Sequence, residues 1–184
     1  MSKKIVVLTG SPKDNGNSFA MTAAFINSAE AKGHKVVRFD TAKKTVGGCL
    51  ACNSCFSKGK ACVNDDDFNE MASDIFSADA IVLTSPLYWY TFSAKLKAVI
   101  DKFYAFCIAE ENMSKFKGKE CGLIVACEDS DPTAMDGIVA SYEHIAHHLE
   151  WKSLGTVLIH GVLDPGDINK TDGITKAKDL AEKF

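Results

Sequence analysis

A stretch rich in Gly, Ser and Asn near the start of the chain has the composition of a phosphate-binding loop. It runs from Gly10 to Ser18 and directly follows the apolar run Ile5–Leu8. An amphipathic helical pattern begins where it ends, so the loop would join a strand to the N-terminus of a helix. Such a junction leaves backbone N–H groups free and presents the positive end of a helix dipole, and both favour an anion.

The spacing within this loop restricts the kinds of phosphate ligand that it could bind. Walker A needs four residues between its glycines and then a lysine, whereas five residues separate Gly10 from Gly16 and Asn17 follows. The dinucleotide signature G-x-G-x-x-G is also absent. Hydroxyl groups and a single cation, Lys13, suit one phosphate monoester. The alternative is an ordinary strand-to-helix turn in which Asn17 or Ser18 is the N-cap.

Four cysteines have a spacing that suits metal ligation. They lie in the segment Thr41–Val63, which has no clear periodicity, and follow the pattern C-x2-C-x2-C-x6-C: Cys49, Cys52, Cys55 and Cys62. Three thiolates separated from each other by two residues can reach three corners of one cubane, and the fourth can come from further along the loop. This pattern is typical of [4Fe–4S] ligation. Free thiols in a structural or redox-active loop, or a zinc site, are the alternatives.

The other cysteines and two histidines have simpler interpretations. Cys107, Cys121 and Cys127 lie among apolar residues and are expected in the core. His144 and His148 are spaced i, i+4, but no Glu directly follows His144 as H-E-x-x-H requires. We therefore expect a surface-facing pair of histidines and no metal site there.

The elements that must position these residues alternate along the chain. Five apolar runs are expected to be strands, at residues 5–8, 35–40, 80–84, 122–126 and 156–160. Five helices are also expected. The first begins where the phosphate loop ends, and the others begin at Asp65–Asp67, at Ser93 (a long helix that includes Phe103), at Pro132 and at Thr171 or Asp172. Parallel strands need crossover connections, so this alternation predicts an α/β fold with a parallel sheet covered on both faces.

Ligands of such sheets bind beyond the carboxyl ends of the strands, where three loops are expected to meet. These loops are residues 10–18, 85–91 and 127–132. The second contains three adjacent aromatic residues, Tyr88-Trp89-Tyr90, which suit a planar ligand. A surface or dimer patch is the alternative for these three residues. The third loop is acidic, and Glu128 and Asp129 are further candidates.

Composition restricts the classes of partner. The chain of 184 residues is expected to form one domain, residues 1–184, with a cysteine-rich loop at about 41–63. Its formal net charge is −3, with 21 basic and 24 acidic residues mixed along it, so neither nucleic acid nor a membrane is expected as a partner. The apolar run after Lys4 is too short for a signal peptide or a membrane span. We expect a cytoplasmic protein with reduced thiols.

With these loops in place, the chain resembles the flavodoxin-like NAD(P)H-dependent FMN reductases, and is most similar to their iron-sulfur flavoprotein branch. The resemblance covers residues 5 to about 104, and its motifs are Gly10-Ser11-Pro12-Lys13 with Gly16-Asn17-Ser18, Cys62-Val63-Asn64-Asp65-Asp66, and Ser85-Pro86-Leu87-Tyr88-Trp89 with residues 93–101. It implies a flavodoxin-like three-layer sandwich with a five-stranded parallel sheet of order 2-1-3-4-5. The loop after the fourth strand departs from the glycine-rich version of some relatives.

The same resemblance implies FMN as the cofactor. By position, the FMN phosphate would contact Ser11, Lys13, Asn17 and Ser18, and the ribityl chain and ring would lie against Pro86, Leu87, Tyr88 and Trp89. The implied activity is hydride transfer from NAD(P)H to the flavin, then electron transfer to a small-molecule or protein acceptor, in a homodimer or homotetramer. A [4Fe–4S] cluster on the four cysteines would relay single electrons. No catalytic side chain is assigned, because the cofactor carries the chemistry. A non-catalytic electron carrier and a cysteine-loop redox or metal sensor are the alternatives.

Overall fold

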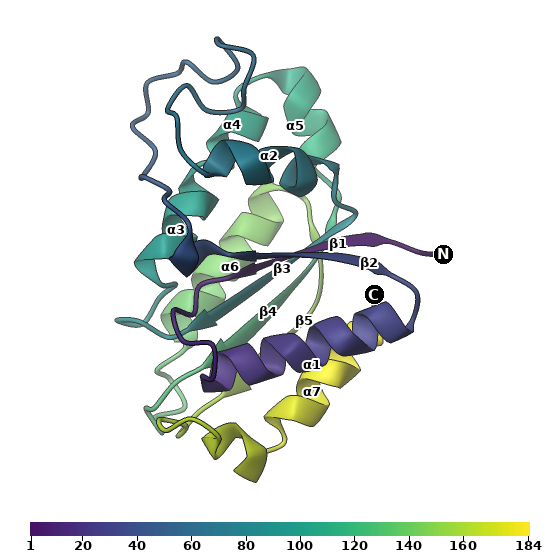
Figure 1. Cartoon of the computed structure of the whole chain (residues 1–184), viewed down its shortest axis with the longest axis vertical. Coiled ribbons are helices and arrows are strands. Elements are labelled where there is room, and N and C mark those ends of the chain that lie inside the picture. Colours follow the sequence, from purple (N-terminus) through teal and green to yellow (C-terminus); the bar gives the residue numbers. More distant parts are fainter.

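A five-stranded parallel sheet forms the centre of the computed structural model, which describes residues 1–184 (Figure 1). The strands are β1 (Lys4–Thr9), β2 (Lys35–Asp40), β3 (Ala80–Pro86), β4 (Glu120–Ala126) and β5 (Lys152–Ile159). Their order is β2-β1-β3-β4-β5 and every neighbouring pair is parallel, which confirms the predicted fold class and strand order.

Helices cover both faces of the sheet. α1 (Asn17–Ala31) and α7 (Gly173–Ala181) pack side by side on one face (Figure 1). The other face is covered by α2 (Phe68–Ser77), α3 (Ala94–Asp101), α4 (Tyr104–Cys107), α5 (Glu110–Phe116) and α6 (Asp136–His148). Two short 3₁₀ turns, η1 (Thr41–Lys43) and η2 (Asp167–Lys170), complete the chain. None of the helices combines the length and apolar character that crossing a membrane requires.

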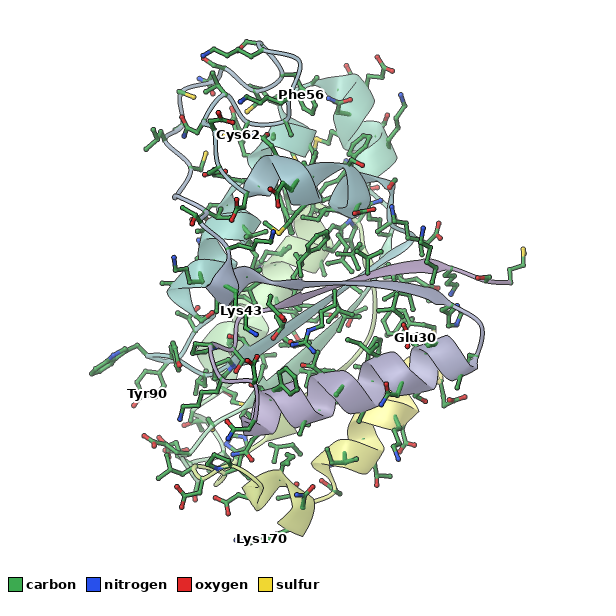
Figure 2. All side chains as sticks on the ribbon, viewed as in Figure 1. Glu30, Lys43, Phe56, Cys62, Tyr90 and Lys170 are labelled. Carbon is green, nitrogen blue, oxygen red and sulfur yellow. The ribbon has the colours of Figure 1, made fainter.

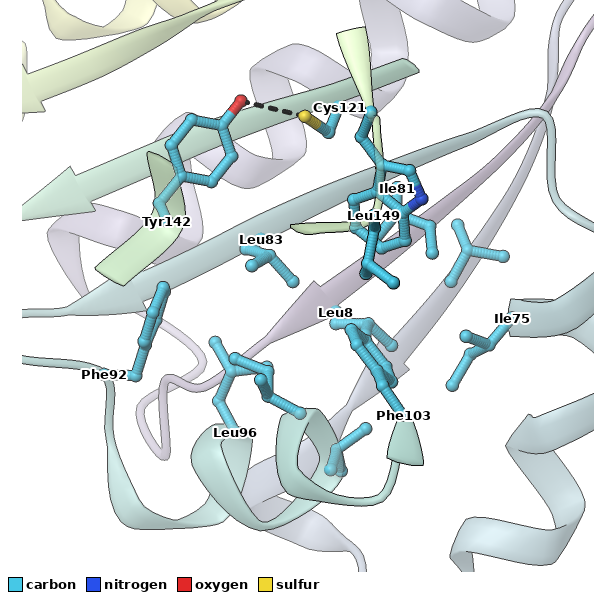
Figure 3. Close-up of a cluster of buried hydrophobic side chains, with 14 of the residues drawn as sticks. Leu8, Ile75, Ile81, Leu83, Phe92, Leu96, Phe103, Cys121, Tyr142 and Leu149 are labelled. Carbon is cyan, nitrogen blue, oxygen red and sulfur yellow. Dashed lines mark hydrogen bonds between the residues drawn. The ribbon is translucent and has the colours of Figure 1, made fainter. Parts of the chain in front are cut away.

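The alternation of side chains along the strands divides the core in two. In β1, Ile5 and Val7 pack toward α1 and α7, whereas Val6 and Leu8 pack toward the other helices. Figure 3 shows Leu8 within the larger of these clusters, where the Tyr142 hydroxyl lies 3.2 Å from the Cys121 thiol. The sheet therefore separates an α1–α7 core from an α2–α6 core.

Several boundaries differ from those predicted. The long helix expected from Ser93 ends at Asp101, because the N–H groups of Lys102 and Phe103 bond three residues back and tighten the last turn. α4 and α5 follow as separate short helices, and α5 had not been predicted. β5 begins at Lys152 rather than residue 156, since its first residues are polar and exposed and give no apolar signal. Gly16, and neither Asn17 nor Ser18, is the N-cap of α1.

His34, at the amino-terminal edge of the sheet, generates a pH prediction. Its Nδ1 accepts a hydrogen bond of 3.1 Å from the backbone N–H of Lys3, while its Nε2 is buried without a partner. Burial, followed by the nearby positive charges of Lys32 and Lys3, lowers the pKa of His34 below its ordinary value of 6.5. The unfolded chain therefore binds this proton at higher pH than the folded chain does, and stability falls as the pH drops through 6.5 toward the folded pKa.

We expect His34→Gln, which keeps an acceptor for Lys3, to lose less stability than the unsubstituted protein when the pH is lowered from about 7.5 to about 5.5. Urea unfolding at both pH values measures this difference. His144→Gln, at an exposed position on α6, is the matched control and should leave the pH dependence unchanged. Identical pH dependence in His34→Gln and the unsubstituted protein would contradict the assignment.

Candidate functional site

A cavity of about 590 Å³ opens at the carboxyl ends of the strands. This volume is within the range of small-molecule sites. Its walls come from four loops, which follow β1, β3, β4 and β5. They bring together all eight residues that the sequence assigned to cofactor binding, together with nine more: Ser11, Pro12, Lys13, Gly16, Asn17, Ser18, Pro86, Leu87, Tyr88, Trp89, Tyr90, Ala126, Cys127, Glu128, Asp129, Val162 and Leu163.

The N-terminus of α1 forms one end of this cavity. Gly16 is its N-cap, no side chain caps its first turn, and no acidic residue lies in that turn. The first N–H groups of a helix have no intrahelical acceptor, so they remain available to a ligand. Ser18, in this first turn, lines the cavity, and Asp14, the acidic residue of this loop, is paired with Lys43 at 2.5 Å. This end of the cavity therefore fits a phosphate group.

The side chain of Asn17 links the first turn of α1 to the segment after β5. Its side-chain Nδ2 donates to the carbonyl of Asp164 at 3.1 Å, and its Oδ1 accepts the N–H of Ile168 at 3.2 Å. Both atoms of the amide are thus engaged by the segment after β5, which supplies Val162 and Leu163 to the cavity wall. These two bonds leave the backbone N–H of Asn17 and the second N–H of its Nδ2 unused, and the side chain joins two walls of the cavity.

A strained two-residue hairpin forms another wall of the cavity. The N–H of Tyr88 donates to Thr91 at 3.0 Å and the N–H of Thr91 donates back at 3.1 Å, so Trp89 and Tyr90 occupy the turn. Their φ angles are +46° and +64°, in a turn where Asn and Gly are the favoured residues. The turn leaves Trp89 92% exposed beside the cavity. Strain of this kind persists where surrounding structure holds it and marks sites of function.

The loop after β4 places a thiol and two carboxylates on the cavity wall. Cys127 is buried, as predicted for a core cysteine, and also lines the cavity. Its Sγ donates to the carbonyl of Asp129 at 3.2 Å and lies 3.6 Å from Nδ1 of His160. Burial raises the pKa of the Cys127 thiol. Glu128 and Asp129, the acidic candidates from the sequence, lie beside it.

Sequence reasoning missed Val162 and Leu163. They follow β5, and a parallel β5 necessarily ends at the same edge as β1, β3 and β4. The signal was thus present in the expected topology, although these two residues carry no recognisable chemistry.

The cysteine segment forms a loop away from this cavity (Figure 2). Cys49 and Cys52 are exposed, whereas Cys55 and Cys62 are half-buried and pack against the α2–α6 core. Burial raises the pKa of Cys55, and the other three thiols, Cys62 foremost, add to this rise. No three His, Cys, Asp or Glu side chains in the structure are gathered into a group that could hold a metal ion. As donors, four thiols on one loop match the chemistry of iron.

Cys107 and the two histidines of α6 border a second hollow of about 380 Å³, between α3, α4 and α6. His144 and His148 are exposed at its rim, as the sequence predicted, and form no metal-binding group.

The parallel strand order β2-β1-β3-β4-β5, with helices on both faces, defines a flavodoxin-like α/β protein. The family model described as "Flavodoxin-like fold" matches residues 3–184, and the chain belongs to this family. It is 29% identical over 188 residues to an iron-sulfur flavoprotein of Archaeoglobus fulgidus, covering 98% of this chain and 78% of that protein.

Two solved structures share the fold. One is an FMN-dependent NADH-azoreductase from Bacillus anthracis in complex with FMN, with a TM-score of 0.72, 16% identity and 98% of each chain covered. The other is an NAD(P)H:quinone oxidoreductase from Methanothermobacter marburgensis, with a TM-score of 0.71, 18% identity, and 98% of this chain and 96% of that one covered.

The packing of the aromatic hairpin against α6 can be tested by substitution. A Cβ on Gly137, in the first turn of α6, would lie 2.7 Å from the carbonyl oxygen of Tyr90. We expect Gly137→Ala to displace the hairpin and to weaken binding of FMN, the ligand that the resemblance implies, roughly tenfold, which corresponds to about 1.4 kcal/mol. Quenching of FMN fluorescence on titration measures the affinity. Glu143→Ala, at an exposed position on α6, is the control, and equal affinity of the two variants would show that the hairpin does not contribute to the site.

Proposed function

We propose that this protein is an FMN-dependent oxidoreductase that takes hydride from NAD(P)H and passes electrons to an acceptor. The observation that carries the proposal is one cavity whose lining includes both an uncapped helix N-terminus and an aromatic hairpin. A phosphate ester attached to a planar ring has this same polarity. The names of the two structural neighbours, one of them in complex with FMN, agree with it.

The residues present fit this cofactor. The first-turn N–H groups of α1, the hydroxyl of Ser18 and the cation of Lys13 would hold the phosphate. The segment Pro86–Trp89 would flank the ring, and the side-chain amide of Asn17 would keep the wall after β5 in place. Bound FMN supplies hydride acceptance and one-electron chemistry. The protein contributes orientation, exclusion of water and the local field.

Acidic residues set the sign of that field. Glu128 and Asp129 lie on the wall formed by the loop after β4, and Lys13 is the one Lys or Arg among the lining residues. Their negative charges disfavour additional negative charge in the cavity. We infer that they lower the reduction potential of the bound flavin and so favour electron donation to the acceptor.

Anaerobic titration with NADH and NADPH tests the proposed activity. We expect bleaching of the flavin absorbance with at least one nucleotide, and restoration of the absorbance by a quinone or azo acceptor. Ser18→Asp places a carboxylate at the phosphate end and should weaken FMN binding by roughly tenfold or more, whereas Ser18→Ala should have a small effect. A flavin that neither nucleotide reduces would instead indicate a non-catalytic electron carrier.

We further propose that Cys49, Cys52, Cys55 and Cys62 hold a [4Fe–4S] cluster. The spacing of the four thiols and their place on one loop support this assignment, as does the name of the Archaeoglobus fulgidus relative. In this role the cysteine loop would accept electrons singly after a two-electron reduction of the flavin. The acceptor would then be a protein or a small molecule that reaches the loop.

Metal analysis of protein purified without air tests the cluster. We expect about four irons and about four acid-labile sulfides per chain, with broad absorbance beneath the flavin bands. Replacing Cys55 and Cys62 with Ser should remove the iron and leave the flavin content unchanged, because neither residue lines the cavity. A pure flavin spectrum without iron would show that the thiols serve another purpose, and bound zinc would assign the loop to a structural site.

A further inference from the structure

The cysteine loop is closed at its neck by paired contacts between its two ends. The N–H of Thr45 donates to Oδ2 of Asp67 at 2.7 Å, and the N–H of Asp67 donates to the carbonyl of Thr45 at 3.0 Å. The N–H of Gly47 donates to Oδ2 of Asp66 at 3.0 Å. The residues between these contacts, 48–65, therefore form a loop whose ends meet and which contains all four cysteines.

A buried ion pair lies beneath this neck. The ammonium group of Lys102 contacts Oδ2 of Asp66, the oxygen that also accepts the N–H of Gly47. The Lys102 side chain is 2% exposed and that of Asp66 12%, whereas the Lys97–Asp101 pair on α3 is 48% and 41% exposed. Lysine is almost never fully buried unless it is paired, and an unpaired buried charge carries a large desolvation cost. Asp66 therefore cannot leave the neck without stranding the charge of Lys102.

The break between α3 and α4 places Lys102 at the neck of the loop. Lys102 is the C-cap of α3, at the point where the helix predicted to continue instead ends. Its ammonium group lies 5.5 Å from the centroid of the Phe68 ring, in the first turn of α2. Oδ1 of Asp66 accepts the N–H of Phe68 at 3.2 Å. One carboxylate thus joins the start of the loop, α2 and the α3–α4 junction.

Three further hydrogen bonds fix the loop to α2 and α4. The N–H of Cys62 donates to Oδ1 of Asn69 at 2.8 Å, and Nδ2 of Asn69 donates to the carbonyl of Asn64 at 2.8 Å. The Tyr104 hydroxyl donates to Oδ1 of Asn53 at 2.8 Å. Cys62 is therefore anchored next to the neck, while the tip of the loop is joined to α4 by the hydrogen bond between Asn53 and the exposed Tyr104.

From these contacts we infer that Lys102 and Asp66 are the positioning pair of the cysteine loop. They hold the neck closed and keep the thiols of Cys55 and Cys62 against the α2–α6 core, where a metal group bound by all four thiols must form. The closure itself does not depend on any metal. Its consequence for metal retention rests on the proposed iron-sulfur function.

Alkylation of iron-free protein tests the closure directly. Lys102→Met keeps the length of the side chain and removes its charge, so Asp66 is free to turn toward water. We expect N-ethylmaleimide to modify Cys55 and Cys62 roughly tenfold faster in this variant, because the neck opens more often. The exposed Cys49 and Cys52 should react as before. Peptide mass spectrometry gives the rate for each cysteine, and Lys97→Met is the matched control.

A second variant covers the case in which Lys102→Met does not fold. Asp66→Asn combined with Lys102→Met leaves no unpaired charge, and it should fold while still raising the alkylation rates of Cys55 and Cys62. FMN binding should be unchanged, since no residue of the neck lines the cavity. Unchanged rates at both cysteines in a folded variant would overturn the inference.

Reconstitution with ferrous iron and sulfide extends the test to the metal. The folded variants should lose iron to a chelator several-fold faster than the unsubstituted protein does, whereas Lys97→Met should not. Equal rates of iron loss would overturn the role in metal retention. If the unsubstituted protein takes up no iron, the cluster proposal fails, and the alkylation rates still decide whether the pair closes the loop.

Discussion

The uncapped first turn of α1 is the constraint on which the site depends. A side-chain cap there would stabilise the helix by about 1 kcal/mol, and Asn17 and Ser18 are both residue types that cap well. Instead, Gly16 takes the cap position, and the amide of Asn17 bonds to the segment after β5. The free N–H groups are therefore satisfied only by water or by an anionic ligand. This arrangement gives up intrinsic helix stability and leaves backbone donors open to the cavity.

The hairpin that contains Trp89 and Tyr90 is held in place by close backbone packing. Trp89 and Tyr90 both have left-handed backbone conformations, which cost of order 1–3 kcal/mol each. The absence of a side chain at Gly137 lets the Tyr90 carbonyl approach α6 closely. Because the Tyr90 carbonyl packs closely against α6, the hairpin has a defined position even though the Trp89 side chain projects into solvent. Rigid placement of an exposed aromatic residue suits contact with a planar ligand or a second protein.

How far the sequence predicts this structure depends on whether the signal is local. Hydrophobic runs and crossover logic were enough to predict the parallel sheet, and the family resemblance added its strand order. The strand-edge rule and this resemblance together also identified residues that share one cavity. The break at Lys102 and the partners of Asn17 were not predictable in this way, since each depends on groups far away in the chain: Asp66 for Lys102, and Asp164 and Ile168 for Asn17. The short helix α5, and the strand β5, which begins with polar residues, lack the periodicity that identifies longer elements.

The division of the core by the sheet gives the two proposed redox sites separate foundations. The phosphate end of the cavity rests on α1, whose buried residues belong to the α1–α7 core, while Cys55 and Cys62 pack against the α2–α6 core. Substitutions in well-separated clusters without shared partners have nearly additive effects on stability. A change in the cysteine loop can therefore alter metal binding without disturbing the phosphate end. The strands β1, β3 and β4 contribute side chains to both cores, so these strands offer a path for structural coupling between the two sites.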